Sequence, residues 1–152
     1  MNRSILKNRY WSLRHGQSEA NVQGIIVSNP TIGIEHFGLS QEGRLQISSI
    51  PLNALKTSLD LSTTSPKASK CSSARVVIYS SDFCRARQTA DIFRDRLDKD
   101  LSIQQTSLLR ERFFGELDMG DDSAYDKVWQ EDAKNAAHTS FSVESVNEVL
   151  TR

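Results

Sequence analysis

Arg14-His15-Gly16 is the stretch of this chain best suited to do chemistry. It follows a short apolar run from Tyr10 to Leu13. An imidazole beside a fixed cation at the carboxyl end of a strand lies where open α/β sheets hold their ligands, and it can attack phosphorus directly. The Arg14 guanidinium can hold two phosphoryl oxygens, and Gly16 lets the backbone come close to the anion. The tripeptide therefore indicates a phosphate site, although such a tripeptide also occurs by chance in loops.

The overall charge of the chain argues against a polyanionic partner. Nineteen basic residues balance nineteen acidic ones, so the formal net charge is +0. Because no net field attracts a nucleic acid, we expect anion recognition to come from a local cluster of arginines. The candidates are Arg14, Arg85, Arg87, Arg110 and Arg112.

Length and composition predict one globular domain over residues 1–152. The chain has 152 residues, of which 38% are hydrophobic and 25% charged, as in an ordinary soluble protein. Two cysteines, Cys71 and Cys84, form neither a disulfide framework nor a metal-ligand cluster, which favours a reduced compartment. The apolar run begins about residue 10, and no stretch approaches the roughly 20 apolar residues of a membrane helix. We therefore expect a cytoplasmic protein without a membrane segment.

The elements that must position these residues alternate between strands and helices. Short β-branched or apolar runs indicate the strands, and apolar residues at helical spacing indicate the helices. The expected elements are a strand over 9–13, a loop over 18–39, a helix from Ser40 that Pro51 divides, a strand over 75–81, a helix over 83–97, a strand over 101–109, a helix from Asp122 or Ser123 through about Ala137, and a last helix that begins within 143–150.

We expect two of the segments outside the strands and helices to have particular roles. The loop over 18–39 follows His15 directly, and a loop of that length in a compact domain is commonly functional, so we expect part of it to form a rim of the pocket. From Ser62 to Ala74 the sequence turns to Ser, Thr, Lys and one Pro, which predicts a surface insertion over residues 62–75.

Four separated motifs resemble, in order and spacing, those of the histidine phosphatase superfamily, the phosphoglycerate-mutase-like group. They are Arg14-His15-Gly16 with Asn21, Leu39-Ser40-Gln41-Glu42-Gly43 with Gln46, Ser80-Ser81 with Arg85-Ala86 and Thr89-Ala90, and the run from Leu109 to Gly115. The Arg-Glu-Arg-Phe-Phe-Gly run and Glu144-Ser145-Val146-Asn147 are most similar to the metal-independent phosphoserine-phosphatase-like branch. The resemblance implies a three-layer α/β/α phosphoglycerate-mutase-like fold.

The resemblance also implies a role for each candidate site residue. His15 would be the nucleophile that forms a phosphohistidine, and Arg14 and Arg85 would hold the phosphoryl oxygens and neutralise charge in the transition state. Asn21 would add a neutral donor, and Glu111 would be the general acid and then the general base. The implied partner is a small phosphorylated substrate, and no metal ion or other cofactor is needed.

Taken alone, the same residues allow plainer interpretations. Arg85 could form an ordinary ion pair with Asp82 or Asp91 near the start of its helix. Glu111 lies between two arginines, as in a surface salt-bridge cluster, and Asn21 by itself would be a simple loop residue.

One element of the family pattern is not found. The family carries a second catalytic histidine, followed by glycine, after an apolar strand that lies downstream of the segment where this chain ends. His36 and His138 follow no such strand, so we interpret both as surface or loop residues. We therefore expect a C-terminally truncated chain with an incomplete fold and low or absent activity, because a positioned transition-state donor is worth roughly 10²–10³ in rate.

Three functions remain open at this point. A phosphomonoesterase is favoured over phosphoglycerate-mutase-type phosphoryl transfer, because mutases need a closed, water-poor site and tend to carry an acid where this chain has Gln17. A non-catalytic phospho-ligand or protein-binding module is the third possibility. The retention of His15 and Glu111 argues against it, since a binding pocket needs neither a nucleophile nor an acid.

Overall fold

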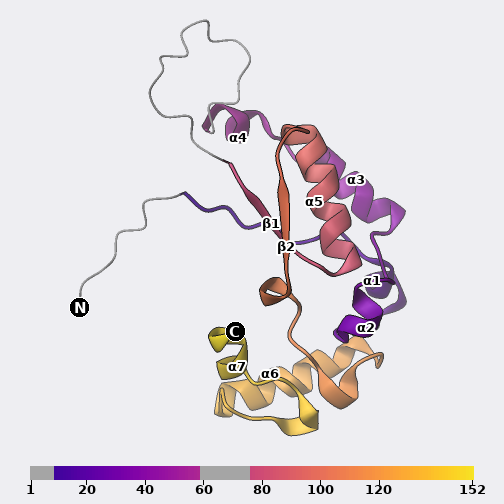
Figure 1. The fold of residues 1–152 in the computed structure, drawn as a ribbon. Helices are drawn as coiled ribbons and strands as arrows, with labels where there is room; N and C mark the ends of the chain where they lie inside the picture. Colours follow the sequence, from indigo (N-terminus) through magenta and orange to yellow (C-terminus); the bar gives the residue numbers. More distant parts are fainter. Residues whose placement is uncertain (1–8, 59–75) are drawn as a thin grey trace, which may run out of the picture.

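Two parallel strands, β1 (Ile78–Ser81) and β2 (Ile103–Thr106), form the sheet in the computed structural model, which describes residues 9–58 and 76–152. Ile78 pairs with Ile103 and Ser81 with Thr106, so both strands end at the same edge of the sheet. Figure 1 shows the other elements around them. These are α1 (Glu19–Gln23), α2 (Pro30–Gly33), α3 (Gln41–Ser49), α4 (Asn53–Ser58), α5 (Cys84–Leu97), η1 (Ser107–Leu109), η2 (Gly115–Leu117), η3 (Asp122–Ala124), α6 (Tyr125–Lys134), η4 (Ser140–Ser142) and α7 (Val146–Thr151).

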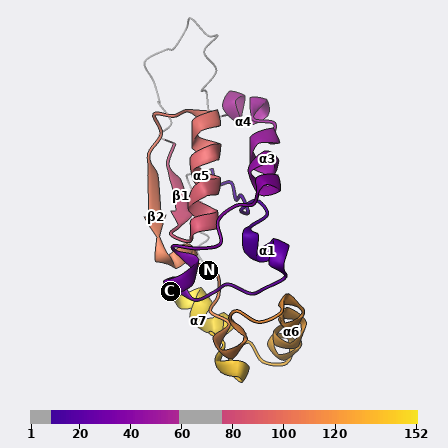
Figure 2. The same ribbon diagram turned by 90° about the vertical axis from the view of Figure 1, so that its right-hand side faces the viewer.

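Helix α5 connects the two strands and lies on one face of the sheet, with α3 packed beside it (Figures 1 and 2). A parallel pair needs such a crossover, and the helix predicted over 83–97 forms over nearly the same residues. Leu52 and Leu97, the last residue of α5, are buried together, and partly buried apolar side chains pack around them. The strands predicted over 75–81 and 101–109 are confirmed in part, since both are shorter than predicted and η1 follows β2 directly.

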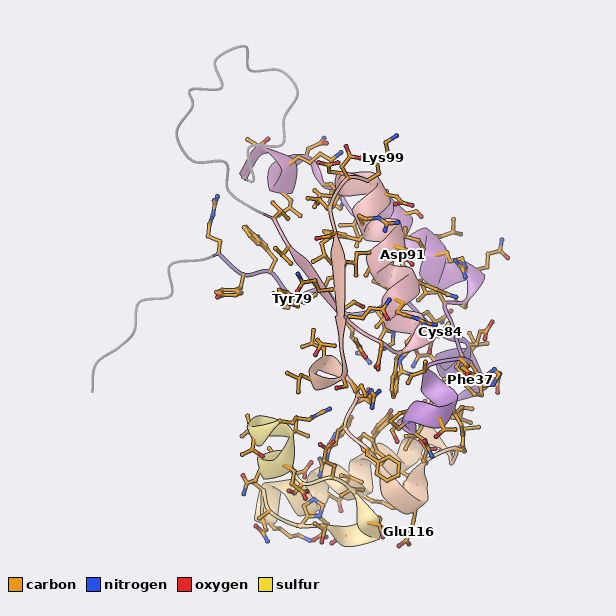
Figure 3. All side chains as sticks on the ribbon, in the orientation of Figure 1. Phe37, Tyr79, Cys84, Asp91, Lys99 and Glu116 are labelled. Atoms are coloured by element: carbon orange, nitrogen blue, oxygen red, sulfur yellow. The ribbon has the colours of Figure 1, made fainter. Side chains whose placement is uncertain are left out.

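The opposite face of the sheet has no helix over it within residues 9–58 and 76–152. Tyr79 projects from β1 away from α5 (Figure 3), and 60% of its surface is exposed. The described residues thus form two of the three expected layers.

The strand predicted over residues 9–13 is wrong. No β-ladder of the described residues includes this segment, and Tyr10, Trp11 and Leu13 are exposed. An apolar run favours extended backbone, but a strand exists only where a neighbour pairs with it. In the described part of the chain β1 pairs with β2 alone.

The predicted loop over 18–39 contains two short helices and a buried segment. Ser18 caps α1 by accepting a hydrogen bond from the Asn21 N–H, and Asn29 caps α2, which has Pro30 in its first turn. Ile26 and Val27 between these helices are buried. The prediction of a loop was therefore too coarse, because two N-caps were not recognised as helix starts.

The next helices follow the sequence closely. Ser40 caps α3 by accepting a hydrogen bond from the Gly43 N–H, and Pro51 separates α3 from α4, as predicted. The predicted insertion over 62–75 lies outside the described residues.

The carboxyl-terminal helices form a second group beyond the carboxyl ends of the strands (Figure 1). Asp121 is the N-cap of η3, which leads directly into α6; the predicted N-cap was Asp122 or Ser123. Helix α6 ends at Lys134 rather than near Ala137. Ser145 caps the last helix, α7. A core of five buried residues ties this group to the amino-terminal half: Ile26, Phe114, Ala124, Val128 and Val143. Among the described residues, none of the helices combines the length and apolar character needed to cross a bilayer.

Candidate active site

The Arg14-His15-Gly16 turn packs against the amino-terminal part of α3 and against α5. The Gly16 N–H donates a hydrogen bond to Thr89 Oγ1 at 3.3 Å. A Cβ on Gly16 would lie 2.5 Å from the Gly43 carbonyl oxygen, and a Cβ on Gly43 would overlap the Gln17 carbonyl. Glycine is therefore required at both positions, and this close backbone contact holds the turn that carries His15 against α3.

The imidazole of His15 is oriented by its own backbone. Nδ1 lies 2.7 Å from the Gly16 carbonyl oxygen, which can only accept, so Nδ1 carries the proton and Nε2 has its lone pair available. Burial lowers the pKa of His15, the nearby charges of Arg85 and Arg14 lower it further, and the Gly16 hydrogen bond partly opposes them. A neutral imidazole with a free Nε2 is the form that can attack phosphorus.

Arg85, in the first turn of α5, is almost fully buried, with only 7% of its side chain exposed. Its Nη2 donates a hydrogen bond to the Val27 carbonyl at 3.1 Å and lies 3.7 Å from Glu111 Oε2. The guanidinium also stands over the Phe83 ring, 5.0 Å from its centroid. Burial lowers the pKa of Arg85, and the Glu111 carboxylate opposes that shift.

Glu111 does not form a salt-bridge cluster with the two arginines beside it in the sequence. Arg110, on one side, binds Asp82 through two short hydrogen bonds, from Nε at 2.8 Å and from Nη2 at 2.6 Å. Arg112, on the other side, donates to Asp132 at 2.7 Å. Glu111 pairs with neither flanking arginine and instead faces Arg85.

The plainer pairings of Arg85 are absent as well. Asp82 is taken by Arg110, and Asp91 lies 3.4 Å from Arg94. The structure thus brings His15, Arg85 and Glu111 into one electrostatic cluster from three separate segments of the chain.

Arg14 acts electrostatically on this cluster, whereas the contacts of Asn21 are with Ser18 at the start of α1. The Arg14 side chain is exposed, and its charge lowers the pKa of both His15 and Arg85. Asn21 Oδ1 accepts hydrogen bonds from the Ser18 N–H and hydroxyl, each at 3.0 Å. In the described part of the chain Asn21 has no hydrogen bond to His15, Arg85 or Glu111, so its expected role as a donor to the phosphoryl group stays a prediction.

The segment Ile26 to Asn29, part of the predicted loop, contacts Arg85 through the Val27 carbonyl and is itself held by several hydrogen bonds. Asp118 Oδ1 accepts hydrogen bonds from the Ser28 N–H at 2.6 Å, the Ser28 hydroxyl at 2.7 Å and the Asn29 N–H at 2.9 Å. The Phe114 N–H donates to Ser28 Oγ at 2.9 Å. These bonds fix the neighbouring Val27 carbonyl, which Arg85 uses.

Sequence reasoning missed Tyr125, the first residue of α6. Burial and the Glu111 carboxylate raise its pKa, and the charges of Arg85 and Arg14 lower it, so its phenol belongs to the same electrostatic cluster. The only signal in the sequence was an aromatic pair with Trp129 at helical spacing, a pattern equally typical of a core.

Residues 64–152 match the sequence model of the histidine phosphatase superfamily (branch 1). The chain belongs to this superfamily. Since the match covers more than half of the chain, the family indicated by the four motifs is confirmed. A search of curated protein sequences finds no match.

Solved structures similar to this histidine phosphatase chain share its fold. Mycobacterial hydrolase 2 has a TM-score of 0.63 at 23% identity, over 91% of this chain and 52% of its own. A mycobacterial glucosyl-3-phosphoglycerate phosphatase complexed with VO3 has a TM-score of 0.54 at 22% identity, over 90% and 56%. The alpha-ribazole phosphatase from Shigella flexneri has a TM-score of 0.52 at 24% identity, over 91% and 60%. The chain therefore spans about half to three fifths of the length of these relatives.

Neither of the other histidines joins the site of this histidine phosphatase chain. His36 is an exposed loop residue, as predicted. His138 lies in a loop, as predicted, but it is buried rather than on the surface. Its Nε2 donates to Asp132 Oδ1 at 2.7 Å, and its Nδ1 accepts from the Ser140 N–H at 3.2 Å. Asp132 also holds Arg112, so His138 is a structural residue that supports the segment after Glu111.

A surface hollow of about 440 Å³ is lined by residues that include Phe37 and Cys84, both labelled in Figure 3. His15, Arg85 and Glu111 do not line it. Within the described ranges, no group of three or more His, Cys, Asp or Glu side chains could hold a metal ion.

Proposed function

We propose that the chain is a phosphomonoesterase that acts through a phosphohistidine on His15. The observation that carries this proposal is the orientation of His15. Its Nδ1 proton is held by the Gly16 carbonyl, its pKa is lowered, and its free Nε2 stands in the field of Arg85.

In the first step, Nε2 of His15 attacks the phosphorus of a phosphomonoester and the bond to the ester oxygen breaks. Glu111, in its protonated form, gives its proton to the departing alkoxide, which leaves as an alcohol. Arg14 and Arg85 bind the equatorial oxygens and neutralise charge that spreads over them in the transition state. Asn21 supplies a neutral donor to the same oxygens.

In the second step, the Glu111 carboxylate takes a proton from a water molecule as that water attacks the phosphohistidine. The N–P bond breaks, inorganic phosphate leaves, and His15 returns to its neutral form. The two arginines provide the charge neutralisation in both steps, so the mechanism proceeds without a metal ion.

Hydrolysis is favoured over transfer to a second substrate because the site is open to water. The Glu111 side chain is 36% exposed. Gln17 is committed to the scaffold, since its N–H donates to Gln46 Oε1 at 2.9 Å and its Oε1 accepts from the Ser40 hydroxyl at 2.8 Å. We also propose a cytoplasmic location, which the ordinary composition and the two cysteines support.

The test is the release of inorganic phosphate from p-nitrophenyl phosphate by the 152-residue chain. We expect slow but measurable release that His15→Ala abolishes and that His36→Ala, at an exposed loop position, leaves unchanged. Equal release by the wild-type and His15→Ala chains would remove the proposed mechanism.

A further inference from the structure

Thr89 is a buried residue of α5 whose hydroxyl makes two hydrogen bonds. Oγ1 accepts from the Gly16 N–H at 3.3 Å and donates to the Arg85 carbonyl at 2.8 Å. A threonine hydroxyl has one proton to donate and a backbone N–H can only donate, so these two bonds use the group fully in this sense. The hydroxyl therefore joins the turn that carries His15 to the backbone of Arg85.

Gly16 is held on both sides of the turn. His15 Nδ1 donates to the Gly16 carbonyl at 2.7 Å, so the orientation of the imidazole follows the position of this residue. On the α3 side, the Gly43 carbonyl leaves no space for a Cβ on Gly16. On the α5 side, within residues 9–58 and 76–152, the bond to Thr89 is the only hydrogen bond between residues 14–16 and that helix. The position of the imidazole relative to α5 thus depends on one hydroxyl.

One of the two bonds of Thr89 is ordinary for a helix, and the other is not. Thr89 lies one turn after Arg85, and a helical threonine commonly donates to the carbonyl four residues earlier. That bond alone would explain only a local preference for threonine. The bond to Gly16 spans 73 residues of the chain and ends on the turn beside His15. Helix formation does not need this second bond, so its role lies in the site.

We propose that Thr89 is a positioning residue whose hydroxyl sets the place of His15 relative to Arg85. This assignment rests on the proposed function, because it concerns the nucleophile and the cation that we propose for that reaction. A displacement of about 1 Å between reacting groups costs about 10²-fold in rate. Loss of the hydroxyl leaves the buried Gly16 N–H without its acceptor, so the turn must shift toward another partner or admit water.

The experiment compares Thr89→Val with Thr89→Ser in the 152-residue chain. Valine has nearly the shape of threonine but no hydroxyl, whereas serine keeps the hydroxyl. Label uptake from acetyl phosphate labelled in its phosphoryl group measures attack by His15, since this leaving group does not need the Glu111 proton. At a temperature where every variant is folded, we expect Thr89→Val to lower the rate of uptake by about tenfold to a hundredfold and Thr89→Ser to stay within about threefold of the wild type.

Two further measurements distinguish positioning from stability. The calorimetric affinity of Thr89→Val for inorganic phosphate should change less than its rate of labelling, because both arginines remain. NMR titration of the His15 ring should give a higher pKa in Thr89→Val than in the wild type, because the imidazole is no longer held beside Arg85.

Thr57→Val is the matched control. The Thr57 hydroxyl donates to the carbonyl four residues earlier, that of Asn53, at 3.0 Å, but it lies at an exposed position in α4. This variant loses the same helical bond as Thr89→Val and should label as the wild type does.

The outcomes separate this assignment from the function on which it rests. If the wild-type chain takes up no label, the proposed function fails and the assignment fails with it. If the wild type labels and Thr89→Val labels at the same rate with only a lower unfolding midpoint, the hydroxyl is structural and the assignment is wrong, while the proposed function stands. If Thr89→Ser is slowed as much as Thr89→Val, the methyl group matters rather than the hydroxyl, which also overturns the assignment. Thr89→Ala takes the place of Thr89→Val if the valine variant does not fold, with the same expected loss.

Discussion

Arg85 Nη2 lies 3.7 Å from Glu111 Oε2, although two other arginines are the direct neighbours of Glu111 in the chain. Arg110 and Arg112 bind Asp82 and Asp132 instead. These pairings hold the Glu111 segment by its flanks and leave its own carboxylate facing Arg85, the cation that we propose binds the phosphoryl group. The flanking arginines thus support the segment, and Arg85 is left for the role that we propose for it.

Replacement of Arg85 by alanine should remove the buried cation that we propose holds the phosphoryl oxygens. We expect the rate of phosphate release from p-nitrophenyl phosphate to fall by about 10²–10³, as for loss of one positioned transition-state donor. Arg87→Ala is the control, because Arg87 is on the same helix but donates to the Ile34 carbonyl. A similar loss in both variants would assign Arg85 to the stability of α5 alone.

Replacement of Glu111 by glutamine should affect substrates according to their leaving groups. An alkyl phosphate needs a proton on its departing oxygen, and general acid catalysis is typically worth about 10²–10⁴ in rate. A nitrophenolate leaves without that help, so the loss should be much smaller. Steady-state rates on both esters measure the difference, with Glu42→Gln on exposed α3 as control. Equal slowing of both esters would indicate that Glu111 only positions Arg85.

The pH below which activity is lost should depend on the protonation of His15. Burial and the two arginines lower the pKa of His15, so the imidazole stays neutral below the ordinary histidine value of about 6.5. As pH falls through the lowered pKa, protonation removes the Nε2 lone pair and the rate should fall. A pH series of phosphohistidine formation, with NMR titration of the His15 ring, locates this step. Loss of reactivity with a midpoint above 6.5 would contradict the description of the site.

Asp132 should contribute stability that is lost in acid. Its hydrogen bonds from Arg112 and from His138 lower its pKa. A carboxyl whose folded-state pKa is lowered stabilises the protein above its unfolded value of about 4, and this contribution disappears as pH falls through the folded value. We expect Asp132→Asn to cost about 2–3 kcal/mol in free energy of unfolding at neutral pH and much less in acid. Denaturant titrations at several pH values test this.

The control for that experiment is Glu131→Gln, the adjacent residue in α6, whose exposed ion pair with Lys134 should not change the unfolding midpoint. If the two variants behave alike at every pH, the Asp132 cluster is not a stabilising element.

Much of the framework could be predicted from local signals in the sequence. Ser40 and Pro51 define the start of α3 and its separation from α4, and the β-branched run before Ser80 predicts the strand β1. Each of these features depends on backbone chemistry within a few residues. The family was recognisable because four motifs occur in order.

What the sequence could not predict depends on contacts between distant segments. Arg85 faces Glu111 rather than Asp82, because Arg110, which lies 28 residues after Asp82 in the chain, binds Asp82 in the folded structure. His138 is polar and lies in a loop, yet a carboxylate six residues earlier in the chain draws it into the interior. Residues 9–13 have the composition of a strand, but pairing needs a neighbour that composition does not reveal.

The central claim is the covalent step on His15, and trapping the phosphorylated chain tests it most directly. Acetyl phosphate labelled in its phosphoryl group has a good leaving group, so label transfer does not require the Glu111 proton. We predict that the 152-residue chain takes up an acid-labile, base-stable label without added metal, and that peptide mapping assigns it to His15. The label should vanish in His15→Ala and persist in His36→Ala. Undiminished labelling of His15→Ala, or a label that is stable in acid, would contradict the account.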